Sequence, residues 1–376
     1  MDYETLVAYL STEEISAVIG AVVGLTFGIF AQQSRFCLRA ACVEFWRGQT
    51  GKKFAIWLLA FGAAMLATQY LIGAGAIDTG QIRQLNNAGS MSGAIIGGLL
   101  FGGGMVLAGG CASRLLVLSA TGNMRTMVAG LVVTIVAQAS LTGGLSPLRE
   151  EISSWWLVDG SSRSFAGWLP PYGGIMLGAA FLGIALWFAK RHEVSKWLSI
   201  AAMITGFSVA LGWWLTSWQA SNSFDIVQVQ SVSFTGPSAD TLMGLINQPY
   251  LSLSFNVGLV PGVFLGSLLA ALVTREFKWQ QFTQDSGFTR FFIGATLMGF
   301  GGMLAGGCAV GAGVTGGVIL VITAWVALFS MWIGAGVMDW VVDRKADELK
   351  AAAEAARHAT DNLPDFAKAP DMVRMN

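Results

Sequence analysis

The chain has 376 residues, of which 54% are hydrophobic and only 12% are charged, and its mean hydropathy is +0.61. These values lie outside the usual range of soluble domains and indicate an integral membrane protein embedded in a lipid bilayer. The formal net charge is zero, with 22 basic and 22 acidic residues, so the total charge points to no nucleic-acid partner.

Nine apolar stretches are long enough to cross a hydrocarbon layer of about 30 Å. In chain order they cover residues 15–33, 54–73, 92–109, 124–143, 172–189, 197–216, 253–273, 291–305 and 313–338. The third and the eighth are short and rich in glycine. We therefore predict an all-α, polytopic membrane protein with about nine transmembrane segments. The first stretch has no basic leader before it and is expected to remain in the protein as a span.

The basic residues predict the orientation of these spans, because positive charge is retained on the cytoplasmic side. Of the 22 Lys and Arg residues, 19 fall on one set of alternating segments. This set consists of 34–53, 110–123 with Arg125, 190–196, 274–290 and the tail from Asp339. We expect the N-terminus outside the membrane, one transmembrane domain over residues 1–343, and a cytoplasmic C-terminal tail over residues 344–376.

A sequence repeat links the third and the eighth span. The segments 96–112 and 293–309 are identical at 11 of 17 aligned positions, and the shared residues include Cys111 and Cys308 near their ends. In the predicted topology, the two copies cross the membrane in opposite directions. This is the pattern of an inverted repeat, which usually places a substrate site between the halves. We expect inverted halves at roughly 15–143 and 197–338, with the span 172–189 as the joint between them.

Glycine has two different interpretations along the chain. The GxxxGxxxG patterns at Gly20, Gly24 and Gly28, and at Gly258, Gly262 and Gly266, are typical of close helix packing. Clustered glycines disfavour a continuous helix instead. We therefore expect helix breaks in the sets Gly102, Gly103, Gly104, Gly109, Gly110 and Gly299, Gly301, Gly302, Gly306, Gly307. Broken backbone at membrane depth suggests a pathway, and exposed amides at a helix start favour an anion.

The four cysteines, Cys37, Cys42, Cys111 and Cys308, do not form a metal-binding pattern. The chain has no CxxC motif, and its two histidines lie in predicted cytoplasmic segments. We therefore expect neither a metal nor a cofactor. Repetition after a helix break favours a functional role for Cys111 and Cys308, whereas Cys42 is more typical of a small buried hydrophobic residue.

Three motifs together resemble the YeeE/YedE sulfur transport family of bacterial membrane proteins. They are SRFCLRAA around Cys37, GGGMVLAGGCASRLL around Cys111 and GFGGMLAGGCAVGAGVTGG around Cys308. The resemblance implies an hourglass-like helical transporter of thiosulfate, with no catalytic residues, in which these three cysteines contact the substrate. It also implies a separate TusA-like sulfurtransferase as a partner at the cytoplasmic face.

The chemistry of thiosulfate suits these residues. Its terminal sulfur is a weak hydrogen-bond acceptor that a thiol can hold, and backbone amides beside Gly110 and Gly307 can bind its oxygens. Several weak contacts in series permit conduction, so we predict a thiol relay without a covalent intermediate. Arg114 either guides the anion at the cytoplasmic mouth or extends to the lipid headgroups.

Two other functions stay open at this point. One is transport of a selenium compound or of another sulfur species through the same architecture. The other is a quinone-linked membrane thiol-disulfide oxidoreductase, which the dispersed cysteines and the missing CxxC disfavour. The segment 217–252, which carries no Lys or Arg, is expected to form a lid or vestibule loop outside the membrane.

Overall fold

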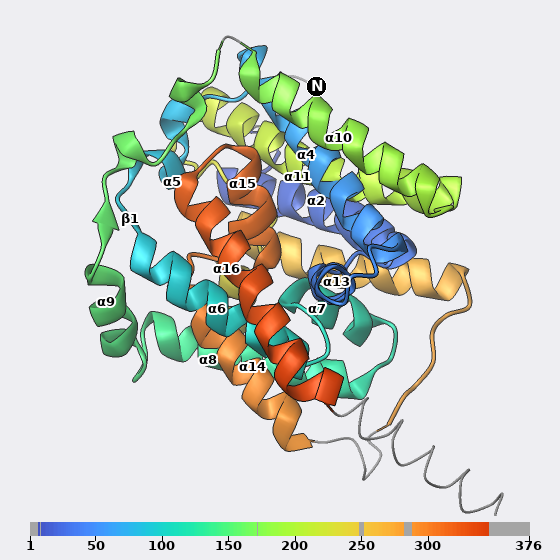
Figure 1. Cartoon of the computed structure of the whole chain (residues 1–376). Coiled ribbons are helices and arrows are strands. Elements are labelled where there is room, and N and C mark those ends of the chain that lie inside the picture. The colour runs from blue at the N-terminus through green and yellow to red at the C-terminus, as the bar shows by residue number, and fades with distance from the viewer. Residues whose placement is uncertain (1–6, 8, 171, 248–251, 282–287, 346–376) are drawn as a thin grey trace, which may run out of the picture.

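The computed structural model describes residues 7, 9–170, 172–247, 252–281 and 288–345 (Figure 1). Over these residues, nine helical segments are long and apolar enough to cross a membrane. The predicted all-α, polytopic fold is therefore confirmed. The predicted tail, residues 344–376, lies almost entirely outside the described residues.

The long helices form the bundle, and shorter elements lie between them. The long helices are α2 (Thr12–Ser34), α4 (Lys52–Gly73), α6 (Met91–Leu107), α8 (Met124–Leu141), α10 (Gly173–Arg191), α11 (Lys196–Asn222), α13 (Phe255–Val273), α14 (Phe288–Leu304) and α16 (Ile322–Met338). The shorter helices are α3 (Leu38–Trp46), α5 (Arg83–Asn86), α7 (Ala112–Ala120), α9 (Ser146–Ser154), α12 (Thr235–Asn247) and α15 (Gly316–Val318). Two π-helices, η4 (Ala309–Thr315) and η5 (Asp339–Arg344), follow α14 and α16.

The remaining elements are small. Three 3-10 turns, η1 (Thr79–Gln81), η2 (Gly160–Ser162) and η3 (Ala166–Trp168), lie in the connections. Two short antiparallel strands, β1 (Gly89–Ser90) and β2 (Leu157–Val158), pair Gly89 with Val158. They fasten the connection before α6 to the connection after α9.

Helices α2 and α13 pack through their glycines. A side chain added at Gly20, Gly24 or Gly28 would meet backbone atoms of α13, and one added at Gly258 or Gly266 would meet backbone atoms of α2. Gly262 has the same relation to α2. The packing role predicted for both GxxxGxxxG patterns is confirmed, because only glycine permits this approach.

The helices pack in matching pairs. The contact of α2 with α13 matches the contact of α11 with α4, if α2 corresponds to α11 and α4 to α13. In the same way, the contact of α6 with α16 matches the contact of α14 with α8. The short helices follow the same rule, since α3 contacts α4 and α16 while α12 contacts α13 and α8. Two sets of elements, from α2 to α8 and from α11 to α16, therefore share one pattern of packing partners. Helix α10, which packs on α4, belongs to neither set.

The predicted helix breaks are correct at the glycine pairs next to the cysteines. Helix α6 ends at Leu107, four residues before Cys111, and α14 ends at Leu304, four residues before Cys308. The first glycine of each pair, Gly109 or Gly306, has a φ of +80°, which glycine adopts without strain. Both spans therefore consist of two helices joined by a glycine turn.

The prediction of breaks at the earlier glycines is wrong. Gly102 to Gly104 lie within the continuous helix α6, and Gly299 to Gly302 lie within α14. A side chain at Gly102 would meet the backbone of Met331, and one at Gly299 would meet the backbone of Val133. These glycines permit close helix packing, which outweighs their low helix propensity in this buried setting.

The predicted ninth span, 313–338, is also divided. Helix α15 ends at Val318, Leu320 has a φ of +61°, and α16 begins at Ile322. Apolar residues lie on both sides of this turn, so a hydropathy window cannot detect it. The apolar run before the turn belongs to the broken helix that begins at Cys308.

The segment 217–252 differs most from its prediction as an exposed loop. Helix α11 continues to Asn222, and α12 begins at Thr235. Between them the chain runs in extended form into the protein, where Val232 and Phe234 are at most 1% exposed. The part of this segment from Val229 to Phe234 is therefore mostly buried instead of forming an outer loop, and residues 248–251 lie outside the described residues.

Candidate functional site

Four short helices begin in the interior of the protein. They are α3, α7, α12 and η4, and each begins directly after a residue whose carbonyl oxygen accepts the first helical hydrogen bond. The four bonds join Cys37 O to Ala41 N at 3.3 Å, Cys111 O to Leu115 N at 2.9 Å, Phe234 O to Ser238 N at 2.9 Å, and Cys308 O to Ala312 N at 2.8 Å. Helix starts of this kind present free amide groups and a positive dipole end, so they favour an anion.

Cys308 lies at the start of η4 and is 1% exposed. Its Sγ accepts a hydrogen bond from the backbone N–H of Gly311 at 3.4 Å. The following residues, Ala309 to Thr315, are all buried. The thiol therefore has a fixed position over amide groups in the interior of the bundle.

Cys37 and Cys111 lie next to each other, because the break between α2 and α3 meets the break between α6 and α7. Their side chains are close enough to interact, and Ser113 Oγ lies 3.3 Å from Cys111 Sγ. Cys111 is buried and Cys37 is partly buried. The expectation that the cysteines are dispersed is wrong for this pair, since residues 74 positions apart meet at two helix starts.

Arg114 lies on the first turn of α7, close enough to interact electrostatically with both Cys37 and Cys111. Its Nη1 donates to Gln32 Oε1 at 3.5 Å, and Gln32 Nε2 donates to Glu276 Oε2 at 3.0 Å. Glu276 also pairs with Arg35 at 3.3 Å. The guanidinium is partly buried, interacts with both thiols and bonds to Gln32.

Gly110 and Gly307 directly precede Cys111 and Cys308, after which α7 and η4 begin. Both are buried. Gly307 has a φ of +154°, and a side chain there would meet the backbone of Ala312. This tight turn leaves the amides of η4 uncovered by a side chain at position 307.

Cys42 lies within α3 and is fully buried. It does not begin a helix, and it belongs to the apolar core together with Leu38 and Ala41. Its surroundings are those of a small hydrophobic side chain.

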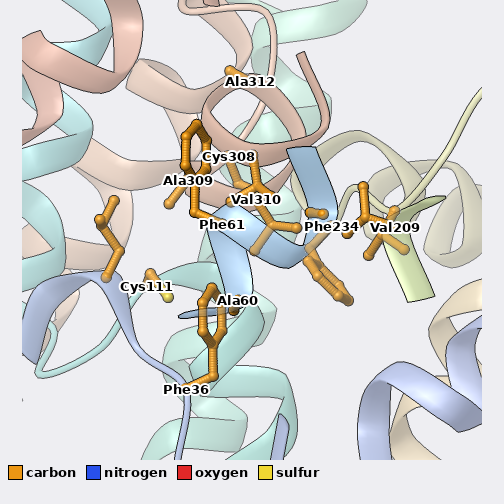
Figure 2. Close-up of a cluster of buried hydrophobic side chains, with 14 of the residues drawn as sticks. Phe36, Ala60, Phe61, Cys111, Val209, Phe234, Cys308, Ala309, Val310 and Ala312 are labelled. Atoms are coloured by element: carbon orange, nitrogen blue, oxygen red, sulfur yellow. The ribbon is translucent and has the colours of Figure 1, made fainter. Parts of the chain in front are cut away.

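The centre of the site is closed. Figure 2 shows Cys111 and Cys308 within one apolar cluster, with Phe36, Ala60, Val310 and Phe234 around them. Cys111 and Cys308 are each 1% exposed. A substrate that passes from one thiol to the other must therefore displace side chains of this cluster.

Two cavities lie among the helices. An apolar cavity of about 250 Å³ lies among α7, α8, α12 and α13. It is lined by Ala112, Leu115, Leu116, Ser119, Thr126, Met127, Gly130, Leu131, Val133, Thr134, Phe234, Thr235, Ser238, Thr241, Leu242, Leu245, Val260 and Phe264. A polar cavity of about 730 Å³ lies between the start of α2, the segment 225–230, α12 and the start of α13. Glu13, Asp225 and Asp240 lie on its wall.

Ion pairs gather at the end of the bundle that holds the breaks at Cys37 and Cys111. Asp343 accepts from both Arg39, at 3.4 Å, and Arg290. Arg47 pairs with Asp339 at 2.8 Å. These pairs fasten η5 to α3 and α14, and they place the segments with most of the basic residues at one end.

Phe234 and Thr235 were not predicted as site residues. Phe234 directly precedes α12, one of the four short helices. Thr235 Oγ1 is buried without a hydrogen-bond partner among the described residues. Their sequence, VSFTGPS, contains no glycine pair before the helix start and no cysteine. The only signal is the sequence GP at 236–237, since proline favours the first turn of a helix.

Over the described residues, no group of three or more His, Cys, Asp or Glu side chains could hold a metal ion. Comparisons with known proteins agree on one activity. The family model described as Sulphur transport matches residues 33–337. The thiosulfate transporter TsuA of Escherichia coli (strain K12) is 27% identical over 370 residues, which cover 89% of this chain and 98% of that protein. The thiosulfate transporter TsuA of Spirochaeta thermophila is 28% identical over 351 residues, 87% of this chain and 99% of that protein.

Proposed function

This chain belongs to the Sulphur transport family and is a transporter, not an enzyme, and from this premise we propose that it imports thiosulfate across the bacterial inner membrane. The observation that carries the proposal is the position of three thiols at three buried helix starts. Each of these starts offers both a soft thiol and backbone amides to one anion. Thiosulfate needs both, because its terminal sulfur and its oxygens differ in hydrogen-bonding strength.

The route runs from Cys308 through Cys111 to Cys37. Cys37 and Cys111 lie close together near the end of the bundle that collects the basic segments, and that end is cytoplasmic by the positive-inside rule. The N-terminus and the polar cavity then face outward. Arg114 stabilises the dianion at the inner pair of thiols, with which its guanidinium interacts electrostatically.

An inverted repeat gives this route its symmetry. The matching packing pairs support it, as do the equal φ values of Gly109 and Gly306. In such a repeat, Cys111 and Cys308 occupy equivalent positions on opposite sides of the centre. The halves are 15–143 and 197–338, and α10 joins them.

Transfer along the route involves no covalent bond. Each contact is weak, so the anion is held well enough to replace its hydration and still leaves readily. A selenium analogue of similar charge is the second substrate class, because a selenium atom is equally soft. A separate TusA-like sulfurtransferase receives the sulfur at the inner face.

The test is uptake of radiolabelled thiosulfate into proteoliposomes with the purified protein. Cys111→Ala and Cys308→Ala are the test variants, and Cys42→Ala is the matched control because Cys42 is an equally buried cysteine within a helix. We expect uptake by the wild type and the Cys42→Ala variant, loss in both test variants, and no competition by excess sulfate. Equal uptake in all four proteins would contradict a role of the thiols.

A further inference from the structure

The fourth buried helix start carries a phenyl ring where the other three carry thiols. Phe234 precedes α12 as Cys37, Cys111 and Cys308 precede α3, α7 and η4, and all four carbonyls accept the same first helical bond. The matching packing of α3 and α12 makes Phe234 the counterpart of Cys37. An aromatic ring cannot hold an anion in the way a thiol does, so this position needs a different role.

The backbone of Phe234 is fixed to the helix that begins at Cys308. Thr315 Oγ1 donates to Val232 O at 2.6 Å. Ser233 lies against Gly311, where any side chain at position 311 would meet the Ser233 side chain. The chain on one side of the ring is thus attached to η4, and a movement of the ring must occur about its own side-chain bonds.

The ring itself borders the helix that begins at Cys111. Phe234 and Ala112 both line the apolar cavity of about 250 Å³. The ring also contacts Phe27, with 5.2 Å between the ring centroids. Phe234 is 1% exposed and lies in the same cluster as both thiols (Figure 2). It is therefore attached to the Cys308 side and shares a cavity with the helix that begins at Cys111.

We propose that Phe234 is the gate between Cys308 and Cys111, and that its ring opens the route by turning into the apolar cavity. The proposal rests on the proposed function and adds the residue that controls its central step. Packed interiors have little free volume, so a side chain that moves needs an adjacent space. The apolar cavity provides that space next to the ring.

The residue after the gate supplies a contact for the passing anion. Thr235 Oγ1 is buried, lines the same cavity and has no hydrogen-bond partner among the described residues. A buried hydroxyl without a partner is costly unless a ligand or water satisfies it. When the ring has turned away, this hydroxyl donates to an oxygen of the anion.

Filling the cavity tests the gate directly. Gly130 lines the cavity, and a side chain added there meets no atom within 4 Å at its Cβ. Gly130→Leu therefore occupies the space without a clash at the backbone. Thr134→Leu, on the next turn of α8, is a second filling variant. Gly183→Leu is the control, since Gly183 has equally open surroundings on α10, which does not border the cavity.

The decisive comparison combines filling with removal of the ring. In the wild-type background, we expect Gly130→Leu and Thr134→Leu to lower thiosulfate uptake by at least about fivefold, the lower end of typical coupling between sites. In the Phe234→Ala background, which has no ring to accommodate, the same substitutions should change uptake by less than about twofold. Gly183→Leu should change neither background.

Phe234→Ala alone should raise the initial rate of uptake and permit competition by sulfate, because the closed state is lost. Phe234→Leu provides the same test if the alanine variant does not fold. The proposal is overturned if filling lowers uptake equally in both backgrounds, or if both ring variants keep the wild-type rate and selectivity.

A second readout separates failure of the gate from failure of the proposed function. The rate at which an anionic methanethiosulfonate reagent modifies Cys111 from outside intact cells requires no thiosulfate transport. We expect this rate to rise in Phe234→Ala and to fall in Gly130→Leu only while the ring is present. If the wild type takes up no thiosulfate, the proposed function is wrong, and the modification rates still decide the gate.

Two variants test the contact between the Thr235 hydroxyl and the anion. Thr235→Val keeps the shape and removes the donor, so the KM for thiosulfate should rise with little change in the maximum rate. Thr235→Ser keeps the donor and should restore the wild-type KM. A wild-type KM in Thr235→Val would exclude the contact.

Discussion

The thiol of Cys308 accepts a hydrogen bond from the backbone amide of Gly311 at 3.4 Å. This contact orients the sulfur over the first turn of η4, and it uses an amide that no other helical group can satisfy. The sulfur and the amides that follow it thus form one surface. An anion that replaces the thiol as acceptor meets both kinds of group at once.

We predict that Cys308→Ser abolishes most transport while the protein stays folded. Serine keeps a polar group at the helix start, but its hydroxyl is a harder partner for a terminal sulfur. A loss of about 1–2 kcal/mol in this contact corresponds to roughly a tenfold fall in uptake. Initial rates in proteoliposomes measure the fall, and a thermal melt checks the fold. Wild-type uptake in Cys308→Ser would show that the helix start alone suffices.

Gly311 is expected to tolerate no side chain. Ser233 occupies the space beside it, so Gly311→Ala should destabilise the protein by about 1–3 kcal/mol, as overpacking in a filled interior does. The midpoint of thermal unfolding in detergent measures this effect. Gly236→Ala is the control, because a side chain at Gly236 would meet nothing within 4 Å. Ser233→Gly should restore part of the stability of Gly311→Ala, and a lack of any restoration would place the strain elsewhere.

The packing around position 311 explains why the second copy of the repeat has a glycine where the first copy has an arginine. Arg114 follows Cys111 by three residues, and Gly311 follows Cys308 by the same number. The buried segment 229–234 packs where a side chain at 311 would lie. The charge is thus confined to the inner pair of thiols.

The pair of Cys37 and Cys111 gives a third prediction. Their thiols are close enough to interact, so an oxidant such as copper phenanthroline should join them in a disulfide. Uptake should then fall and recover after reduction. Mass spectrometry of peptides identifies the bond. Cys42 provides the control, because it is buried within α3 and should remain a free thiol. Absence of the Cys37–Cys111 peptide pair would contradict the meeting of the two helix breaks.

The sequence predicted the helical spans well, because a span of apolar residues needs no tertiary information. The number of spans is confirmed, as are the breaks at Gly109 and Gly306, whereas the predicted ninth span, 313–338, is divided at Leu320. The break at Leu320 could not be predicted, since leucine in a left-handed conformation has no local signature and depends on its surroundings.

The site was predictable where glycine and cysteine recur, and not elsewhere. The repeat pointed to Cys111 and Cys308 because both follow a glycine pair. It did not point to Phe234, whose helix start follows a buried extended segment of valine, serine and glutamine. The proximity of Cys37 and Cys111 was missed as well, because it arises from packing between α2 and α7.

The polar cavity has an unexpected charge for an anion transporter. Glu13, Asp225 and Asp240 lie on its wall, and the described residues of its lining include no Lys or Arg. Asp240 accepts a hydrogen bond from Asn256 Nδ2 at 2.9 Å. Partial burial raises the pKa of Asp240 above its ordinary value of 3.8, and the hydrogen bond opposes this rise to a smaller extent. An ionised Asp240 repels a dianion that enters through this cavity.

We therefore predict that uptake rises as the pH falls toward the pKa of Asp240, which is raised above its ordinary value. Asp240→Asn should raise uptake at neutral pH by about twofold and flatten this part of the pH profile, because one exposed charge is partly screened by salt. The effect on stability has the same sign. A carboxyl whose pKa is raised on folding binds its proton more tightly in the folded state, so its contribution to stability improves as the pH falls through that pKa.

Asp159→Asn is the control, since Asp159 is an exposed carboxylate that does not line the polar cavity. Uptake between neutral pH and about one unit above the ordinary pKa of aspartate separates the two variants. If Asp240→Asn and the wild type had the same pH profile, the anion would not pass this carboxylate. The entrance would then lie away from the polar cavity, although the central thiols would keep their role.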